Sequence, residues 1–141
     1  MAAVARYLAD KSSLTRRHIS AVADVLEPRI RAGLVATCAV VEFEMLWSTR
    51  SPTEFDEVRR DRSFGYEWLS IEDADWQRVL DVQQQLWRTG SMRTVPLPDL
   101  LVAAVAERHR LTVLHYDADF DLISSLTGQP TQWVVPRGSV P

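Results

Sequence analysis

Residues 112–123 read TVLHYDADFDLI, an apolar and β-branched run that ends in three aspartates spaced two apart. Apolar and β-branched residues favour a buried strand, and Asp117, Asp119 and Asp121 come at its end. Carboxylates this close repel one another and are destabilised further when they lose water, so a folded chain keeps them with a cation, with hydrogen-bond donors, or in solvent. The stretch therefore predicts a strand followed by an acidic group that needs one of these three partners.

The spacing around the aspartates excludes three common acidic motifs. A calcium-binding EF-hand loop needs glycine at its sixth position and glutamate at its twelfth, where this chain has Leu122 and Gly128. A phosphatase with an aspartate nucleophile carries its D-x-D near the start of the chain, whereas only about twenty residues follow Asp121 here. A receiver domain needs a lysine after its last strand, and the chain has no lysine beyond Lys11.

Outward from this stretch, strand-like and helix-like segments alternate along the chain. Helical spacing of apolar residues, caps and the stop at Gly33 predict helices, and short apolar runs predict strands. The expected strands are 4–9, 34–36, 66–71, 111–116 and 132–135, and the expected helices are 20–31, 37–50, 52–64, 72–89, one that starts near Pro98, and 118–126. This alternation predicts one α/β domain over residues 1–141: a mostly parallel sheet of about five short strands with helices on both faces.

Composition limits the classes of function. A net charge of −3 and a pI near 5.6 argue against a broad basic face that binds nucleic acid through phosphate contacts alone, but they leave metal-mediated nucleic-acid chemistry open. The single cysteine, Cys38, excludes an intramolecular disulfide and a cysteine-rich zinc site. The start of the sequence lacks a signal-peptide core and no apolar run reaches the roughly 20 residues of a membrane span. We therefore expect a cytoplasmic protein without a membrane segment.

Several acids are expected at one edge of the sheet. Ligands of parallel sheets bind beyond the carboxyl ends of the strands, and Asp10 and Asp117 each follow an expected strand. Asp99 lies in the first turn of a helix, where the helix dipole alone also favours an acid. Glu42 and Glu44 lie about 200° apart on one helix, so only one of them can face a given pocket. Each acid has an ordinary structural explanation by itself, but together they predict an oxygen-only site for Mg²⁺ or Mn²⁺.

Three segments resemble those of one family. YLADKSSL resembles a hydrophobic-Asp-x-Ser opening, CAVVEFEMLWSTRS resembles a helix that contains a glutamate, and VPLPDLLVAAVAERHRLTVLHYDADFDLI resembles an aspartate helix followed by the strand that leads to D-x-D-F. With these segments the chain resembles a VapC-type toxin of the PIN-domain family, the ribonuclease half of a toxin–antitoxin pair. The resemblance extends over nearly the whole chain, and its third segment is the most specific.

The resemblance implies a metal-dependent endoribonuclease of structured RNA, such as tRNA or rRNA, in which a metal-activated water attacks the phosphate. By resemblance the acidic site consists of four residues and one auxiliary ligand: Asp10, Glu44, Asp99 and Asp117, with Asp119. Glu44 is chosen over Glu42 because it precedes MLWS. Candidate RNA contacts beside the first aspartate are Lys11, Ser12, Arg16 and Arg17; Lys11 departs from the family's small residue, and a solvated helix face is the alternative for the two arginines.

The same resemblance implies partners. It implies a homodimer with an RNA groove across it and a cognate VapB-type antitoxin whose C-terminal segment covers the acids. Apolar residues around Trp47, Phe55 and Phe64 are candidates for contact with that antitoxin, and packing in the core is their alternative role. The alternative function is a catalytically silent PIN-like module that only binds a protein partner.

Overall fold

The computed structural model describes residues 3–141. Its strands are β1 (Tyr7–Ala9), β2 (Val35–Thr37), β3 (Glu67–Trp68), β4 (Thr112–His115) and β5 (Thr131–Trp133). Its helices are α1 (Lys11–Leu14), α2 (Ser20–Arg31), α3 (Ala39–Trp47), α4 (Pro52–Arg62), α5 (Asp73–Arg88), α6 (Leu97–His109) and α7 (Asp119–Thr127). The alternation of strands and helices expected from the sequence is confirmed.

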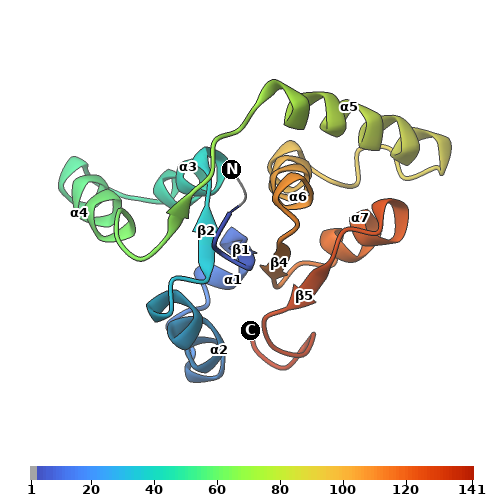
Figure 1. The fold of residues 1–141 in the computed structure, drawn as a ribbon. Helices are drawn as coiled ribbons and strands as arrows, with labels where there is room; N and C mark the ends of the chain where they lie inside the picture. Colours follow the sequence, from blue (N-terminus) through green and yellow to red (C-terminus); the bar gives the residue numbers. More distant parts are fainter. Residues whose placement is uncertain (1–2) are drawn as a thin grey trace.

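The five strands form one parallel sheet in the order β3-β2-β1-β4-β5 (Figure 1). The chain moves from β1 outward to β2 and β3, then returns to the other side of β1 with β4 and β5. The point where the direction changes lies between β1 and β4, and there the register pairs Ala9 with Leu114. A ligand crevice in such a sheet forms outside the carboxyl ends of the strands at this switch point. The fold therefore directs attention to the residues that follow β1 and β4.

Helices cover both sides of the sheet, with α5 and α6 on one side of the row of strands and α2 on the other (Figure 1). Helix α6 is the central one: its segment 99–106 is buried around the whole circumference, and it packs against β1, β4, α3, α5 and α7. Alanines at 103, 104 and 106 let these neighbours approach closely. Among residues 3–141, none of the helices combines the length and the apolar character that a membrane crossing requires.

The structure corrects the expected elements in three places. The strands are shorter than expected, and β3 retains only two residues of the segment 66–71. Between the expected strand 4–9 and helix 20–31 the structure adds the short helix α1, for which Asp10 is the N-cap. The apolar side chains of the expected helix 72–89 do not share one buried face: Val79, Val82 and Leu86 are buried, whereas Trp76, Leu80 and Trp87 are 40–55% exposed. The buried stripe is therefore narrow, and the main neighbours of α5 are α6 and α7.

Candidate metal centre

Asp10 lies directly beyond β1 and is held by backbone and side-chain contacts. Its N–H donates to the carbonyl of Leu114 at 2.9 Å, which ties it to the neighbouring strand β4. Its Oδ2 accepts from the backbone N–H of Ser12 at 2.9 Å and from the Ser12 hydroxyl at 2.6 Å. The side chain is buried, and its other oxygen, Oδ1, has no hydrogen-bond partner among the described residues. Burial raises the pKa of Asp10, the Ser12 donors oppose this, and Asp117 adds to it.

Ser12 connects the ends of the two central strands. While its hydroxyl donates to Asp10, its oxygen accepts from the backbone N–H of Tyr116 at 2.8 Å, just beyond β4. The one-turn helix α1 thereby fixes the Asp10 carboxylate relative to the segment that carries Asp117. Ser12, named from the sequence as a candidate RNA contact, is thus placed to orient the Asp10 carboxylate.

Asp117 is the first aspartate of the opening stretch, and its backbone position is fixed from two sides. Its N–H donates to Nδ1 of His115 at 3.1 Å, and its Oδ1 accepts from the N–H of Asp119 at 2.9 Å. His115 is fully buried, with its ring centroid 5.0 Å from those of Phe120 and Trp133. This buried histidine therefore packs in the core and also accepts a hydrogen bond from the backbone of an acid of the site, a contact that the sequence pattern did not indicate.

Asp99, Asp117 and Asp119 come closest together. One carboxylate oxygen from each lies within 4.8 Å of those of the other two. Asp99, in the first turn of α6, is buried, and its Oδ2 has no partner among residues 3–141. Burial, followed by the charges of Asp10 and Asp117, raises the pKa of Asp99 to about 8. Burial and the charge of Asp117 also raise the pKa of Asp119. Such shifts are typical of carboxylates that lie close together with little solvent around them.

The two glutamates of α3 are separated as the helical geometry requires. Glu44 is on the side of Asp10: burial and then the Asp10 charge raise its pKa, whereas Lys11 lowers it. Its Oε1 is buried without a partner in the described part of the chain. Glu42 points elsewhere and accepts two hydrogen bonds of 2.7 Å from Arg62 and another from Thr37. The structure thus brings Glu44, and not Glu42, to the acids.

Asp121, the third aspartate of the opening stretch, lies outside the acidic group. It is exposed in the first turn of α7, and the indole N–H of Trp133 donates to both of its carboxylate oxygens at 3.1 and 3.2 Å. The question that the three aspartates raised has two answers, because Asp117 and Asp119 join the buried group while Asp121 is solvated and hydrogen-bonded.

The donor set suits a hard divalent cation. Three buried carboxylate oxygens, Asp10 Oδ1, Glu44 Oε1 and Asp99 Oδ2, lack hydrogen-bond partners among residues 3–141. Unpaired buried carboxylates are strongly unfavourable, and several at one edge of a sheet repel one another. All five acids offer oxygen, which Mg²⁺ and Mn²⁺ prefer. The residues present therefore fit the ion that the resemblance implies.

The predicted RNA-contact residues differ in their surroundings. Lys11 Nζ lies 3.8 Å from Glu44 Oε2, so this side chain turns toward the acids. Arg16 donates to the carbonyls of Ser12 and Pro141 and stacks on Tyr116 at 4.5 Å. Arg17 forms a two-point ion pair with Glu27 at 2.5 and 2.9 Å. This internal partner uses the donors of Arg17, so Lys11 and Arg16 are the better placed of the three cations.

A model described as the PIN domain matches residues 6–126, which include all five acids. The chain belongs to the PIN-domain family. Among curated proteins, Ribonuclease VapC21 of Mycobacterium tuberculosis is 40% identical over 134 residues, covering 95% of this chain and 97% of that protein. Ribonuclease VapC51 of the same species is 40% identical over 135 residues, covering 96% and 97%.

Solved structures support the PIN fold. The DNA-bound VapBC of Salmonella typhimurium includes a chain that superposes with a TM-score of 0.75 at 12% identity, covering 94% of this chain and 100% of that one. VapBC2 of Rickettsia felis, bound to a DNA fragment from its promoter, gives 0.72 at 15% identity, covering 90% and 98%. Identities this low show a shared fold and nothing further.

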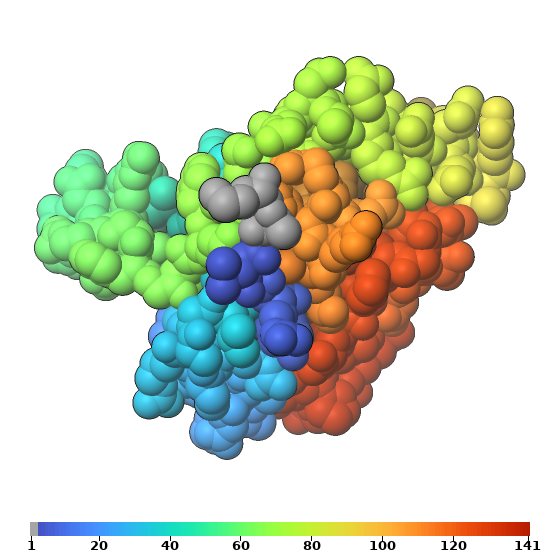
Figure 2. Space-filling view, in the orientation of Figure 1, coloured from blue at the N-terminus to red at the C-terminus, as the bar shows by residue number. Residues whose placement is uncertain are grey.

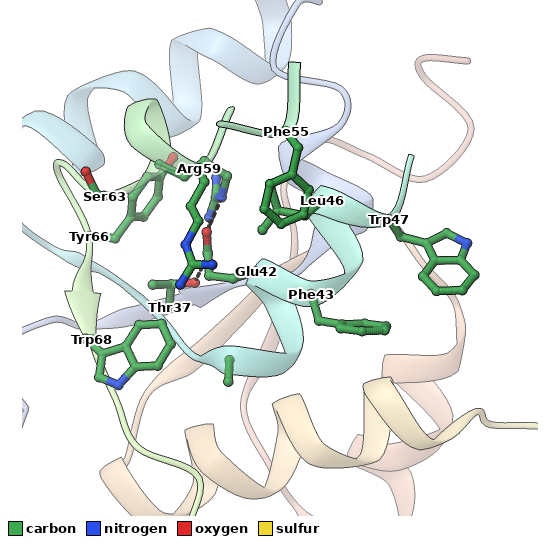
Figure 3. Close-up of a pocket in the computed structure, with 12 residues that line it drawn as sticks. Thr37, Glu42, Phe43, Leu46, Trp47, Phe55, Arg59, Ser63, Tyr66 and Trp68 are labelled. Atoms are coloured by element: carbon green, nitrogen blue, oxygen red, sulfur yellow. Dashed lines mark hydrogen bonds and ion pairs between the residues drawn. The ribbon is translucent and has the colours of Figure 1, made fainter. Parts of the chain in front are cut away.

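This PIN domain has a second feature, an apolar groove between α3 and α4. The groove has a volume of about 720 Å³, and Figure 3 shows aromatic side chains from α3, α4 and the β3 region around it. Figure 2 shows α4 as a lobe that stands out from the body of the molecule, and the exposure of Phe43 and Trp47 shows that the groove is open to solvent. The residues that line it are Thr37, Ala39, Glu42, Phe43, Leu46, Trp47, Phe55, Arg59, Arg62, Ser63, Tyr66 and Trp68.

Trp47 and Phe55, named from the sequence as partner contacts or core residues, both line this groove, and Trp47 is 78% exposed. Phe64, 71% exposed, is not among the lining residues. The sequence reasoning missed Phe43, Trp68 and the buried Glu42–Arg62 pair at the groove. The groove could have been anticipated from the sequence of α3. This helix is apolar on more than one face, so it cannot bury all of its apolar surface against the core on a single side.

Proposed function

We propose that this chain is the toxin of a type II toxin–antitoxin pair and acts as a divalent-metal-dependent endoribonuclease on structured RNA, such as tRNA or rRNA. The observation that carries the proposal is the convergence of five acids from four separate regions of the chain, three of them with buried oxygens that lack a partner in the described structure. The extended identity to proteins named Ribonuclease VapC21 and VapC51 supports the same activity.

In this proposal Asp10, Glu44, Asp99 and Asp117 are the catalytic acids, and Asp119 completes the set that holds the ion. Bound there, Mg²⁺ or Mn²⁺ would supply a Lewis acid for the phosphate oxygen and a water of lowered pKa. The chain's own contribution is to fix the oxygens in advance: Ser12 orients Asp10, and the Asp119 N–H orients Asp117. No serine, cysteine or histidine nucleophile is required. Lys11, Ser12 and Arg16 lie beside Asp10, where they can contact RNA phosphates, and Arg17 does so only if it leaves Glu27.

The proposed partner is a VapB-type antitoxin, and the proposed assembly is a cytoplasmic homodimer. The structures that resemble this fold include VapBC complexes, which supports an antitoxin for this chain as well. The groove between α3 and α4 suits a partner segment with large apolar side chains, which would cover Phe43 and Trp47. The Arg59 side chain at the same groove favours an acidic group in that segment.

Cleavage of RNA by purified full-length variants tests the activity. We expect the wild type to cut total cellular RNA with Mn²⁺ and not with EDTA, and Asp10→Asn and Asp117→Asn to lose more than about 100-fold, since even the outer partners of metal ligands contribute 10–100-fold. The matched control is Asp24→Asn, which removes an exposed acid on α2 and should cut normally. Sequencing the new RNA ends identifies the substrate. Equal cleavage by all variants would refute the site, and the absence of cleavage by the wild type on every RNA would favour the silent module.

A further inference from the structure

Among the five acids, only Glu44 has a lysine or arginine nitrogen within 4.0 Å in the described part of the chain. Asp99, Asp117 and Asp119 have no lysine or arginine nitrogen within 4.0 Å among residues 3–141, although their oxygens lie within 4.8 Å of one another. Asp99 is also 6% exposed with one oxygen unpartnered. This side of the group lacks a cation and has a buried carboxylate oxygen free to bind one.

The other side, formed by Asp10 and Glu44, already has a cation. Lys11 directly follows Asp10, and its Nζ lies 3.8 Å from Glu44 Oε2. Asp10 Oδ2 receives both donors of Ser12. Lys11 is the only lysine in the sequence, and its side chain is 46% exposed, so it reaches the acids from the surface.

We propose that Lys11 is a built-in counter-ion of Glu44 and limits the site to one divalent ion, held by Asp99, Asp117 and Asp119 together with the unpartnered Oδ1 of Asp10. The inference rests on the metal-dependent function proposed above and specifies its stoichiometry. Two-metal nuclease sites place their ions about 4 Å apart. A second ion would have to share Glu44 with an ammonium group at close range, and two positive charges at that separation repel strongly in a partly desolvated site.

Counting bound ions tests the proposal without RNA and without measuring activity. Mn²⁺ is titrated into the full chain, free Mn²⁺ is measured by electron paramagnetic resonance, and bound ions are counted by native mass spectrometry. The variants are Lys11→Met, which removes the charge and keeps the length, and Lys11→Arg, which keeps the charge. The control is Arg6→Met, which removes one exposed positive charge from the opposite end of β1.

We expect one ion for the wild type, Lys11→Arg and Arg6→Met, and two ions for Lys11→Met. Adding Glu44→Gln to Lys11→Met should return the count to one, because the second ion needs that carboxylate. Thermal unfolding checks that each variant is folded, and Lys11→Gln replaces Lys11→Met if the latter is not. Two ions on the wild type, or one ion on the folded uncharged variant, would overturn the role of Lys11. No ion on the wild type would instead refute the metal-dependent function itself.

Discussion

Replacing Asp99 by asparagine should stabilise the metal-free protein, although it should abolish the proposed activity. Asp99 is buried in the first turn of α6, close to Asp117 and Asp119. Burial, with the charges of Asp10 and Asp117, raises its pKa to about 8. A pKa above the unfolded value means that ionisation opposes folding. The ionisation of Asp99 should therefore cost no stability below about pH 4, destabilise the fold increasingly as the pH rises from about 4 to 8, and contribute a constant cost above that.

The loss of folding stability caused by ionised Asp99 can be calculated from how far its pKa is raised. Each unit of pKa difference between the folded and unfolded states corresponds to about 1.4 kcal/mol, so raising the pKa of Asp99 from its ordinary 3.8 to about 8 corresponds to roughly 6 kcal/mol at high pH. Asparagine removes the charge but leaves a buried amide whose hydrogen bonds are incomplete, at a cost of about 1–3 kcal/mol. The expected net gain for Asp99→Asn at high pH is about 3–5 kcal/mol, or roughly 10–15 °C in the melting temperature.

Urea and thermal unfolding in EDTA at about pH 5 and about pH 8 measure this difference. Asp99→Asn should match the wild type at the lower pH and exceed it at the higher one. Asp24→Asn, at an exposed position on α2, should show no such pH dependence. Mn²⁺ should stabilise the wild type more than Asp99→Asn, because the ion removes the same repulsion. The reasoning is refuted if Asp99→Asn is no more stable than the wild type at the higher pH, or if its advantage is equal at both.

Three shorter predictions concern neighbouring features. Ser12→Ala should lower the free energy of unfolding by about 1–3 kcal/mol, as measured in urea, since Asp10 loses a donor and the Tyr116 N–H loses its acceptor; an unchanged midpoint would contradict this. Arg62→Met should cost about 3–5 kcal/mol by leaving Glu42 unpaired, and Arg62→Met with Glu42→Leu should recover most of it; equal losses in both variants would count against the pair. Cys38, whose burial raises its thiol pKa to about 11, should react with thiol reagents only after unfolding, so rapid labelling of the native protein would be inconsistent with the structure.

The fold could be predicted from the sequence because local patterns determine most of it. The parallel α/β arrangement is confirmed, and the apolar run before Asp117 is the buried strand β4. The proximity of the acids follows from topology: once β1 and β4 are neighbours, the residues beyond their ends must be close. The catalytic roles of these acids stay predictions, because the closeness of their oxygens does not establish a reaction.

Features that depend on contacts distant in sequence could not be predicted. The exposure of Trp76 and Leu80 depends on how far α5 overlaps α6, which no periodicity within α5 encodes. The bond from the Asp117 N–H to His115 depends on the ring orientation imposed by Phe120 and Trp133. These details result from packing between segments, and a local pattern carries no information about them.

Helix α3 links the two functional surfaces. Glu44 is turned to the acids beside Asp10, whereas Glu42 and Phe43 line the groove next to α4. Because a helix of nine residues moves nearly as a rigid body, a partner that shifts α3 through the groove must also shift the Glu44 carboxylate. The buried Glu42–Arg62 pair resists such a shift, since it anchors α3 to the end of α4. We therefore expect a partner that binds at the groove to alter the geometry of the acids through this one short helix, and Arg62→Met should make that shift easier as well as destabilise the fold.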